Sequence, residues 1–253
     1  MNTKFLTTAA VLAFSLSTGA QASLVARTGG MVYDTVNNIT WAADANLFKT
    51  QAKSNANLVS EIIAASGGVI HDTANFYDTP ANSGSYTLTT ADFDTSRGEM
   101  TWFGAQAWAN NLTLGGYTDW SLPSTPASAV IGFNKNDSQM SNLFYTQLGG
   151  VKDSSITTTH NANYNLFANI ITDAKYWAGD EWSNKNQAWN FLFSDGFQTA
   201  NGKANGNFFY AWAVRPGDVA ASAPAAVPLP AATWLFLSGL MGVLGLKRRK
   251  NIA

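Results

Sequence analysis

An apolar segment near each end of the chain leaves only the middle of the sequence free to form a globular domain. Residues 9–16 and 231–246 are mostly apolar, whereas residues 23–218 mix polar and aromatic side chains. The chain has no cysteine and only two histidines, His71 and His160. This composition excludes a disulfide framework, a thiolate zinc site and a multi-histidine metal centre. The domain must therefore be held together by its hydrophobic core.

The N-terminal segment has the order of parts found in a secretory signal peptide. Lys4 precedes the apolar run, and Ala20-Gln21-Ala22 supplies the small residues that signal peptidase accepts before a cut. A short buried helix is the alternative, but the small-residue pair and the polar sequence that follows argue against it. We predict a signal peptide over residues 1–22, cleaved between Ala22 and Ser23, and hence an exported protein.

The C-terminal segment combines a proline motif, an apolar run and four cations. The motif consists of Val227, Pro228, Leu229 and Pro230. Residues 231–246 would form a helix of about 24 Å, slightly shorter than a hydrocarbon core of about 30 Å. The cluster at 247–250 favours a cytoplasmic end, and a helix of a soluble core would not explain it. We predict a transmembrane helix over 231–246, joined to the domain by an Ala/Ser/Pro-rich linker at 219–226.

This tail resembles the PEP-CTERM sorting signal, which would span residues 227–250. The most common motif of that family is Val-Pro-Glu-Pro; with Leu229 in place of Glu, this chain matches a Val-Pro-Leu-Pro-Ala variant. The resemblance implies that an exosortase-type transpeptidase in the inner membrane of a Gram-negative bacterium cuts at the motif. The protein would be anchored in that membrane as a precursor and then reach the cell surface or the extracellular matrix.

The charge of the central region argues against nucleic acid as a partner. Residues 23–219 contain 10 basic and 16 acidic side chains, a net charge of about −6. Phosphate backbones require a basic face.

The hydrophobic periodicity predicts an α+β domain with short helices and a small antiparallel sheet. Helical spacing recurs over residues 56–63, 105–112 and 140–148, and each segment is followed by glycine. Residues 32–34 and 39–41 read as a hairpin around Asn37-Asn38. Alternating aromatic residues predict strands over 189–193 and 208–214.

Several pieces of this region occur in an order that resembles the C-terminal domain family of collagen-like bacterial adhesins, the Lcl C-terminal domain. They are Val32-Tyr33-Asp34, Ile39-Thr40-Trp41, Met100-Thr101-Trp102, Ala107 to Leu112, Gly115 to Pro123, Tyr176-Trp177, Ala188-Trp189, Asp195-Gly196 and Ala213 to Pro216. The family usually has Arg where Ser121 stands here. The resemblance implies a single C-type-lectin-like domain over residues 23–218, similar to formylglycine-generating enzymes.

The residues give little support to catalysis. Formylglycine-generating enzymes need cysteines, and neither His71 nor His160 lies in a nucleophile or metal motif. Both histidines lie in polar stretches and are expected to face solvent. Carboxylates arranged as in glycosidases remain an alternative that spacing alone does not test.

Carboxylates, amides and aromatic residues gather on the predicted C-terminal loops. The candidate ligand-binding residues are Asp180, Glu181, Trp182, Asp195, Asn205 and Asn207. Sugars are recognised by such an aromatic face together with planar amides and carboxylates, and calcium would use the same oxygens. The alternative is that Asn, Asp and Gly only form turns. We therefore expect a non-catalytic module that binds polysaccharide or a surface; a purely structural biofilm-matrix protein is the second hypothesis.

Two expectations concern the core. Trp108, Trp120, Trp189 and Trp212 lie at periodic or family-matching positions and should be buried. Arg215 follows an alternating strand, so we expect a carboxylate or carbonyl groups to hold its guanidinium, because an unpaired buried cation is unfavourable.

Overall fold

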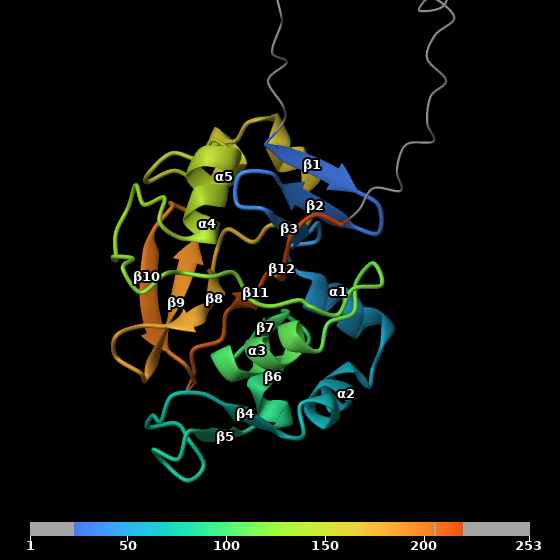
Figure 1. The fold of residues 1–253 in the computed structure, drawn as a ribbon, viewed down its shortest axis with the longest axis vertical. Helices are drawn as coiled ribbons and strands as arrows, with labels where there is room; N and C mark the ends of the chain where they lie inside the picture. Colours follow the sequence, from blue (N-terminus) through green and yellow to red (C-terminus); the bar gives the residue numbers. More distant parts are fainter. Residues whose placement is uncertain (1–22, 205, 220–253) are drawn as a thin grey trace, which may run out of the picture.

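Two four-stranded sheets organise the computed structural model, which describes residues 23–204 and 206–219 (Figure 1). The first sheet has the order β1-β2-β3-β12 and the second β10-β9-β8-β11. Neighbouring strands are antiparallel except for β11 and β8. The strands of the first sheet are Leu24–Arg27, Met31–Asp34, Ile39–Ala42 and Val214–Pro216. Those of the second are Gln198–Gly202, Gln187–Leu192, Lys175–Glu181 and Tyr210–Ala211.

The predicted N-terminal hairpin is confirmed. β2 pairs with β3, with Asp34 opposite Ile39. Asp34 is buried, and its Oδ1 accepts hydrogen bonds from the backbone N–H groups of Val36 and Asn37 at 2.9 and 3.0 Å. Asn38 has a φ of 50°, which Asn tolerates better than most residues. The side chain at the start of the turn therefore fixes the turn.

The three predicted helices are present with shifted ends. α2 spans Leu58–Ala65, α3 spans Trp102–Asn110, and α4 (Gln139–Asn142) continues into a π-helical turn at Leu143–Gln147. The hydroxyls of Thr101 and Ser138 cap α3 and α4 by accepting N–H groups of the first turn. The remaining helices are α1 (Leu47–Ser54), α5 (Ile156–Thr159) and 3₁₀ turns at Thr90–Asp92 and Ala162–Leu166.

The single strand predicted over residues 208–214 is wrong. Tyr210–Ala211 pairs in parallel with β8, whereas Val214–Pro216 pairs antiparallel with β3. Trp212 and Ala213 lie between these two strands and pass the chain from one sheet to the other. Burial does not follow the alternation, because residues 210–215 are all buried.

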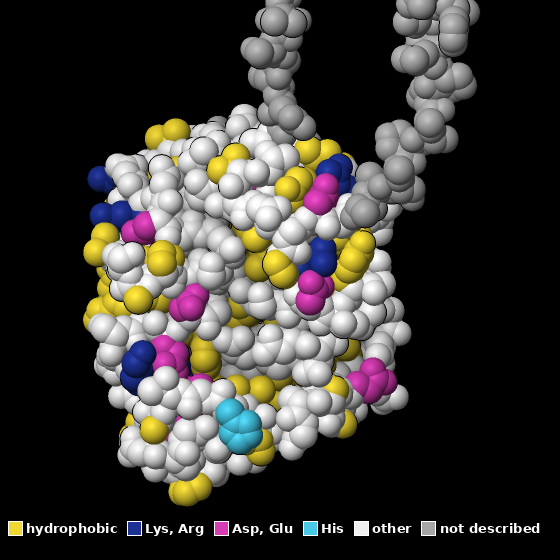
Figure 2. Space-filling view, viewed as in Figure 1, with side chains coloured by type: hydrophobic (Ala, Val, Ile, Leu, Met, Phe, Trp, Pro, Cys, Tyr) yellow, Lys and Arg dark blue, Asp and Glu magenta, His cyan; other side chains and the backbone are white. Residues whose placement is uncertain are grey.

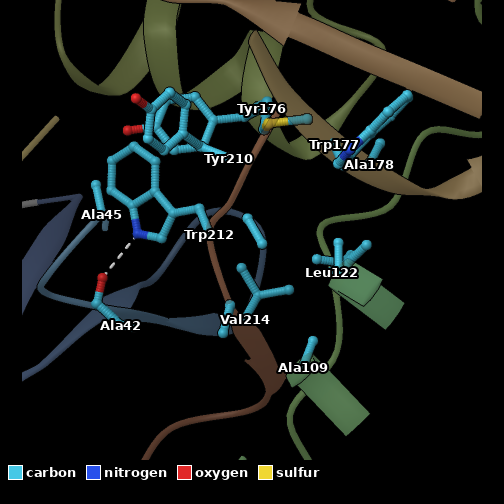
Figure 3. Packing of buried hydrophobic residues seen from close by; sticks show 14 of the residues in the cluster. Ala42, Ala45, Ala109, Leu122, Tyr176, Trp177, Ala178, Tyr210, Trp212 and Val214 are labelled. Atoms are coloured by element: carbon cyan, nitrogen blue, oxygen red, sulfur yellow. Dashed lines mark hydrogen bonds between the residues drawn. The ribbon is translucent and has the colours of Figure 1, made fainter. Parts of the chain in front are cut away.

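Trp212 lies where the two sheets meet (Figure 3). Its side chain is fully buried, and its indole N–H donates to the carbonyl of Ala42 at 2.7 Å. The rings of Trp41 and Tyr176 lie 5.3 and 5.6 Å from it. The four tryptophans predicted to be core are all buried, with 0–3% exposure: Trp108, Trp120, Trp189 and Trp212. That prediction is confirmed.

Residues 69–100 add two small hairpins beside α3 (Figure 1). β4 (Val69–His71) pairs with β5 (Ser85–Thr87), and β6 (Phe93–Asp94) pairs with β7 (Glu99–Met100). The β4–β5 hairpin lies below the end of the second sheet in this view.

The predicted α+β class is confirmed as a mixture of short helices and small, mainly antiparallel sheets. Within residues 23–204 and 206–219, no helix has the length and apolar character needed to cross a membrane. The predicted signal peptide (1–22) and sorting signal (227–250) lie outside the described residues, as does the linker apart from Val219.

Candidate binding site at the β8–β9 turn

The strand register separates the predicted site residues into groups. Glu181 pairs with Ala188, and Gly202 pairs with Gln187, so the β8–β9 turn and the end of β10 lie at the same end of the sheet. Asp195 lies in the β9–β10 turn at the opposite end. The structure therefore brings Asp180–Trp182 near the segment after β10 but does not bring Asp195 to them.

A pocket of about 270 Å³ lies at the β8–β9 turn. Trp182 lines the pocket and is half-buried, whereas Trp189 is only 3% exposed. The backbone N–H of Trp182 donates to the carbonyl of Gln187 at 2.9 Å, which fixes the start of the turn. The lining residues are Ala127, Ala129, Glu181, Trp182, Ser183, Lys185 and Trp189.

The two carboxylates predicted for this site already have partners within the domain. Oδ2 of Asp180 accepts the backbone N–H of Thr125 at 2.6 Å and so ties down the loop that carries Ala127 and Ala129. Glu181 Oε1 accepts from Lys203 Nζ at 2.5 Å, and its Oε2 lies 3.4 Å from Lys185 Nζ. Asp180 therefore positions the loop that lines the pocket, while Glu181 binds Lys203 and lies close to Lys185.

The other predicted residues have varied surroundings. Asp195 Oδ1 accepts the N–H of Phe197 at 2.9 Å, which is a turn contact. Asn207 Nδ2 donates to the carbonyl of Ala204 at 3.2 Å. Asn205 lies outside the described residues. For Asp195 and Asn207, these contacts agree with the turn-forming alternative.

A second, larger hollow of about 560 Å³ lies beside the segment after β10. Phe208 and Gly206 line it together with the exposed side chain of Arg97. Arg97 lies 3.3 Å from a carboxylate oxygen of each of Asp94 and Glu99. The cation that faces this hollow is therefore already balanced by the domain.

The acidic side chains that line the two hollows have pKa values shifted in different directions. Burial raises the pKa of Glu99 in spite of Arg97. A hydrogen bond from the Ser96 hydroxyl, partly offset by burial, lowers the pKa of Asp94. Burial alone would raise the pKa of Glu181, but hydrogen bonds from Lys203 and Thr73 hold it below its usual value. Glu181 is therefore ionised beside Trp182 at neutral pH.

The sequence indicated Lys203 only as a cation near the binding loops, and it predicted neither the burial of this lysine nor its contact with Asp72. Lys203 has no exposed surface, and its Nζ lies 2.6 Å from Asp72 Oδ2. Lysine is the residue least expected inside a domain, and no spacing links these two positions. The two histidines are exposed, as predicted: His71 contacts the Ser85 hydroxyl, and His160 stacks on Tyr164.

Among residues 23–204 and 206–219, no three His, Asp or Glu side chains are arranged to hold a metal ion. On the face shown in Figure 2, charged side chains are sparse, and cations and anions lie mostly next to one another. The Trp182 hollow combines two indole side chains, of Trp182 and Trp189, with one residue of each charge, Glu181 and Lys185.

Comparison with known proteins gives no relative: no family model, curated protein or solved structure matches this chain.

Proposed function

We propose that the chain is exported and that its domain binds an extracellular polysaccharide without turning it over. The observation that carries the proposal is the half-buried Trp182 in its pocket. An indole face packs against the C–H surface of a sugar ring, and hydroxyl, carboxylate and ammonium groups bind the sugar hydroxyls. Ser183, Glu181 and Lys185 supply these groups around the same hollow.

The proposed ligand is a neutral or weakly acidic glycan. The domain carries a net charge of about −6, which disfavours a strongly anionic polymer. Lys185 is the cation that lines the pocket, and Glu181 lies 3.4 Å from it. Calcium bridging remains part of the proposal, since a bound ion would let an acidic glycan approach this surface.

The proposed route to the surface rests on the two ends of the sequence. Signal peptidase would release residues 1–22, and an exosortase-type enzyme would act at Val227–Pro230 while residues 231–246 stay in the inner membrane. A C-type-lectin-like arrangement is proposed for residues 23–218. Its support is the mixture of short helices and small sheets, with the first and last strands in one sheet.

A glycan array with residues 23–219, run with calcium and with chelator, tests the binding proposal. Trp182→Ala should weaken binding at least tenfold, about 1.4 kcal/mol, because the stacking face is lost. Phe208→Ala removes an aromatic side chain from the other hollow and is the matched control, expected to bind as the parent does. Equal melting temperatures would show that both variants are folded.

The outcomes separate the competing functions. Loss of binding with Phe208→Ala but not with Trp182→Ala would move the site to the Arg97 hollow. Absence of binding to any glycan, with normal retention in the cell-surface matrix, would favour the structural biofilm-matrix hypothesis. Turnover of a bound sugar would overturn the non-catalytic proposal.

A further inference from the structure

A lysine amine is enclosed where three segments of the domain meet. Lys203 directly follows β10, Asp72 directly follows β4, and Glu181 ends β8. These strand ends converge at the lower end of the second sheet in Figure 1. Lys203 Nζ lies 2.6 Å from Asp72 Oδ2 and 2.5 Å from Glu181 Oε1. The amine therefore touches two carboxylates at once.

The amine and its two carboxylate partners are almost completely shielded from solvent. The side chain of Lys203 is 0% exposed, and those of Asp72 and Glu181 are 4% and 13% exposed. The rings of Trp102 and Phe103 lie 4.6 and 5.7 Å from Nζ. Keeping three full charges in such a site is unfavourable, because the loss of hydration offsets much of their mutual attraction.

We propose that Lys203 and Asp72 condense into an intramolecular amide bond, and that Glu181 transfers the proton in this reaction. The modification would join the β4–β5 hairpin covalently to the end of β10. It does not depend on the proposed glycan binding, because it is a reaction between two side chains of the folded domain.

The reaction balances without an oxidant, a reductant or a co-reactant. A proton first passes from the ammonium group of Lys203 to the carboxylate of Asp72, which leaves an amine beside a neutral carboxyl group. The nitrogen lone pair then attacks Cγ of Asp72 and forms the new C–N bond. Glu181 takes a proton from the nitrogen and passes it to the leaving hydroxyl. The C–O bond breaks, and one water molecule leaves.

The neighbouring groups suit these roles. Burial and the nearby carboxylates of Asp78 and Glu181 raise the pKa of Asp72 in spite of the contact with Lys203, which favours the neutral carboxyl group. Glu181, whose pKa lies below its usual value, remains available as the base. Asn75 Nδ2 donates to the two carboxylate oxygens of Asp72, at 3.2 and 3.0 Å. Such a donor stabilises negative charge that develops on oxygen.

The amide bond would cross-link the domain covalently, which a sequence without cysteine cannot do with a disulfide. Asp72 and Lys203 are 131 positions apart, so the link would close a long loop. A cross-link that closes such a loop reduces the conformational entropy of the unfolded chain. The linked protein should therefore melt at a higher temperature than a folded variant without the link.

The intact mass of the purified protein under denaturing conditions is the direct test. Once peptide mapping has fixed the two chain ends, the mass should lie below that of the sequence by one water molecule. A tryptic digest should contain a branched peptide that joins residues 54–97 to the segment with Lys203. Full sequence mass in the folded protein, or a mass deficit that maps to other residues, would overturn the proposal.

Single substitutions test the role proposed for each residue in the condensation. Lys203→Arg should show no deficit, and Glu181→Gln should retain the unlinked mass because the proton acceptor is lost. Asp72→Asn should give the parent product by losing ammonia in place of water. Lys175→Arg is the matched control and should keep the deficit. Lys175 is also half-buried, with Nζ 5.1 Å from the ring of Phe209, but its hydrogen-bond partner is Asn201 rather than a carboxylate.

Circular dichroism identifies the folded variants, and only these are compared. A deficit that persists in folded Glu181→Gln would overturn the role of Glu181. A deficit that persists in Lys203→Arg would overturn the whole assignment. If Lys203→Arg does not fold, the parent protein's mass and branched peptide still decide the question.

Discussion

Arg215 holds Asp119 by two parallel hydrogen bonds. Nε lies 2.7 Å from Oδ1, and Nη2 lies 2.9 Å from Oδ2. The guanidinium carbon lies 4.1 Å from the centroid of the Tyr117 ring, and Nη1 donates to the carbonyl of Asp218 at 3.5 Å. The expectation that a carboxylate or carbonyl groups hold Arg215 is confirmed. This contact ties the last strand to the segment after α3.

Arg215→Ala should therefore destabilise the domain by about 1–3 kcal/mol, the range for hydrogen bonds to charged groups. Half of the Asp119 side chain is exposed, which keeps the loss well below that of a fully buried pair. Urea denaturation followed by circular dichroism measures the change. Arg97→Ala is the control: its side chain is 68% exposed, and it should shift stability by less than about 0.5 kcal/mol. Reduced glycan binding with unchanged stability would refute the structural role of Arg215.

The same ion pair predicts a pH dependence. The hydrogen bond from Arg215 lowers the pKa of Asp119, and that from Arg27 lowers the pKa of Asp218. A carboxyl group whose pKa is lower in the folded state stabilises the fold above its unfolded-state pKa, and this contribution is lost as pH falls through the folded-state value.

We expect the parent protein to lose stability as pH falls below about 4, and Asp119→Asn to show a smaller loss over the same range. Asn cannot titrate, so the variant lacks this contribution at every pH. Melting temperatures from pH 6 to 2 check the difference. Parallel curves for the two proteins would contradict the assignment.

The sequence predicts local elements better than their partners. Ser138 and the apolar spacing after it locate the helix at Gln139, because capping and periodicity are local properties. The alternating residues from Phe208 to Val214 indicate extended chain but neither the burial of Ala211 and Ala213 nor the switch between sheets. Pairing with β8 or β3 depends on residues far away along the chain.

In the candidate site, too, local features were predicted better than long-range contacts. Trp182 and Asp195 both lie in turns rich in polar residues, but β9 runs between those turns and separates them. A six-residue strand spans roughly 20 Å, so one small ligand does not reach both ends. The burial of Lys203 could not be predicted because it depends on Asp72, which belongs to a distant hairpin.

Export and tail processing predict the ends of the mature protein. Mass spectrometry of protein recovered from the cell surface or medium should give Ser23 as the first residue and no peptide from residues 234–253. Ala22→Phe should retain the N-terminal segment, since signal peptidase requires a small residue before the cut. An intact tail on the extracellular protein would contradict exosortase processing.

Trp212→Ala should destabilise the domain by about 3–5 kcal/mol, because it removes the ring that fills the space between the sheets. Trp212 is 0% exposed, and the rings of Trp41, Phe167 and Phe193 lie 5.1–5.5 Å away. The variant also leaves the carbonyl of Ala42 without its donor. Phe76→Ala, at a side chain 66% exposed, should change stability by less than about 0.5 kcal/mol. Urea denaturation followed by circular dichroism compares the two variants. A loss below about 1 kcal/mol in Trp212→Ala would mean that the sheets close over the space, and that this ring is not the centre of the core.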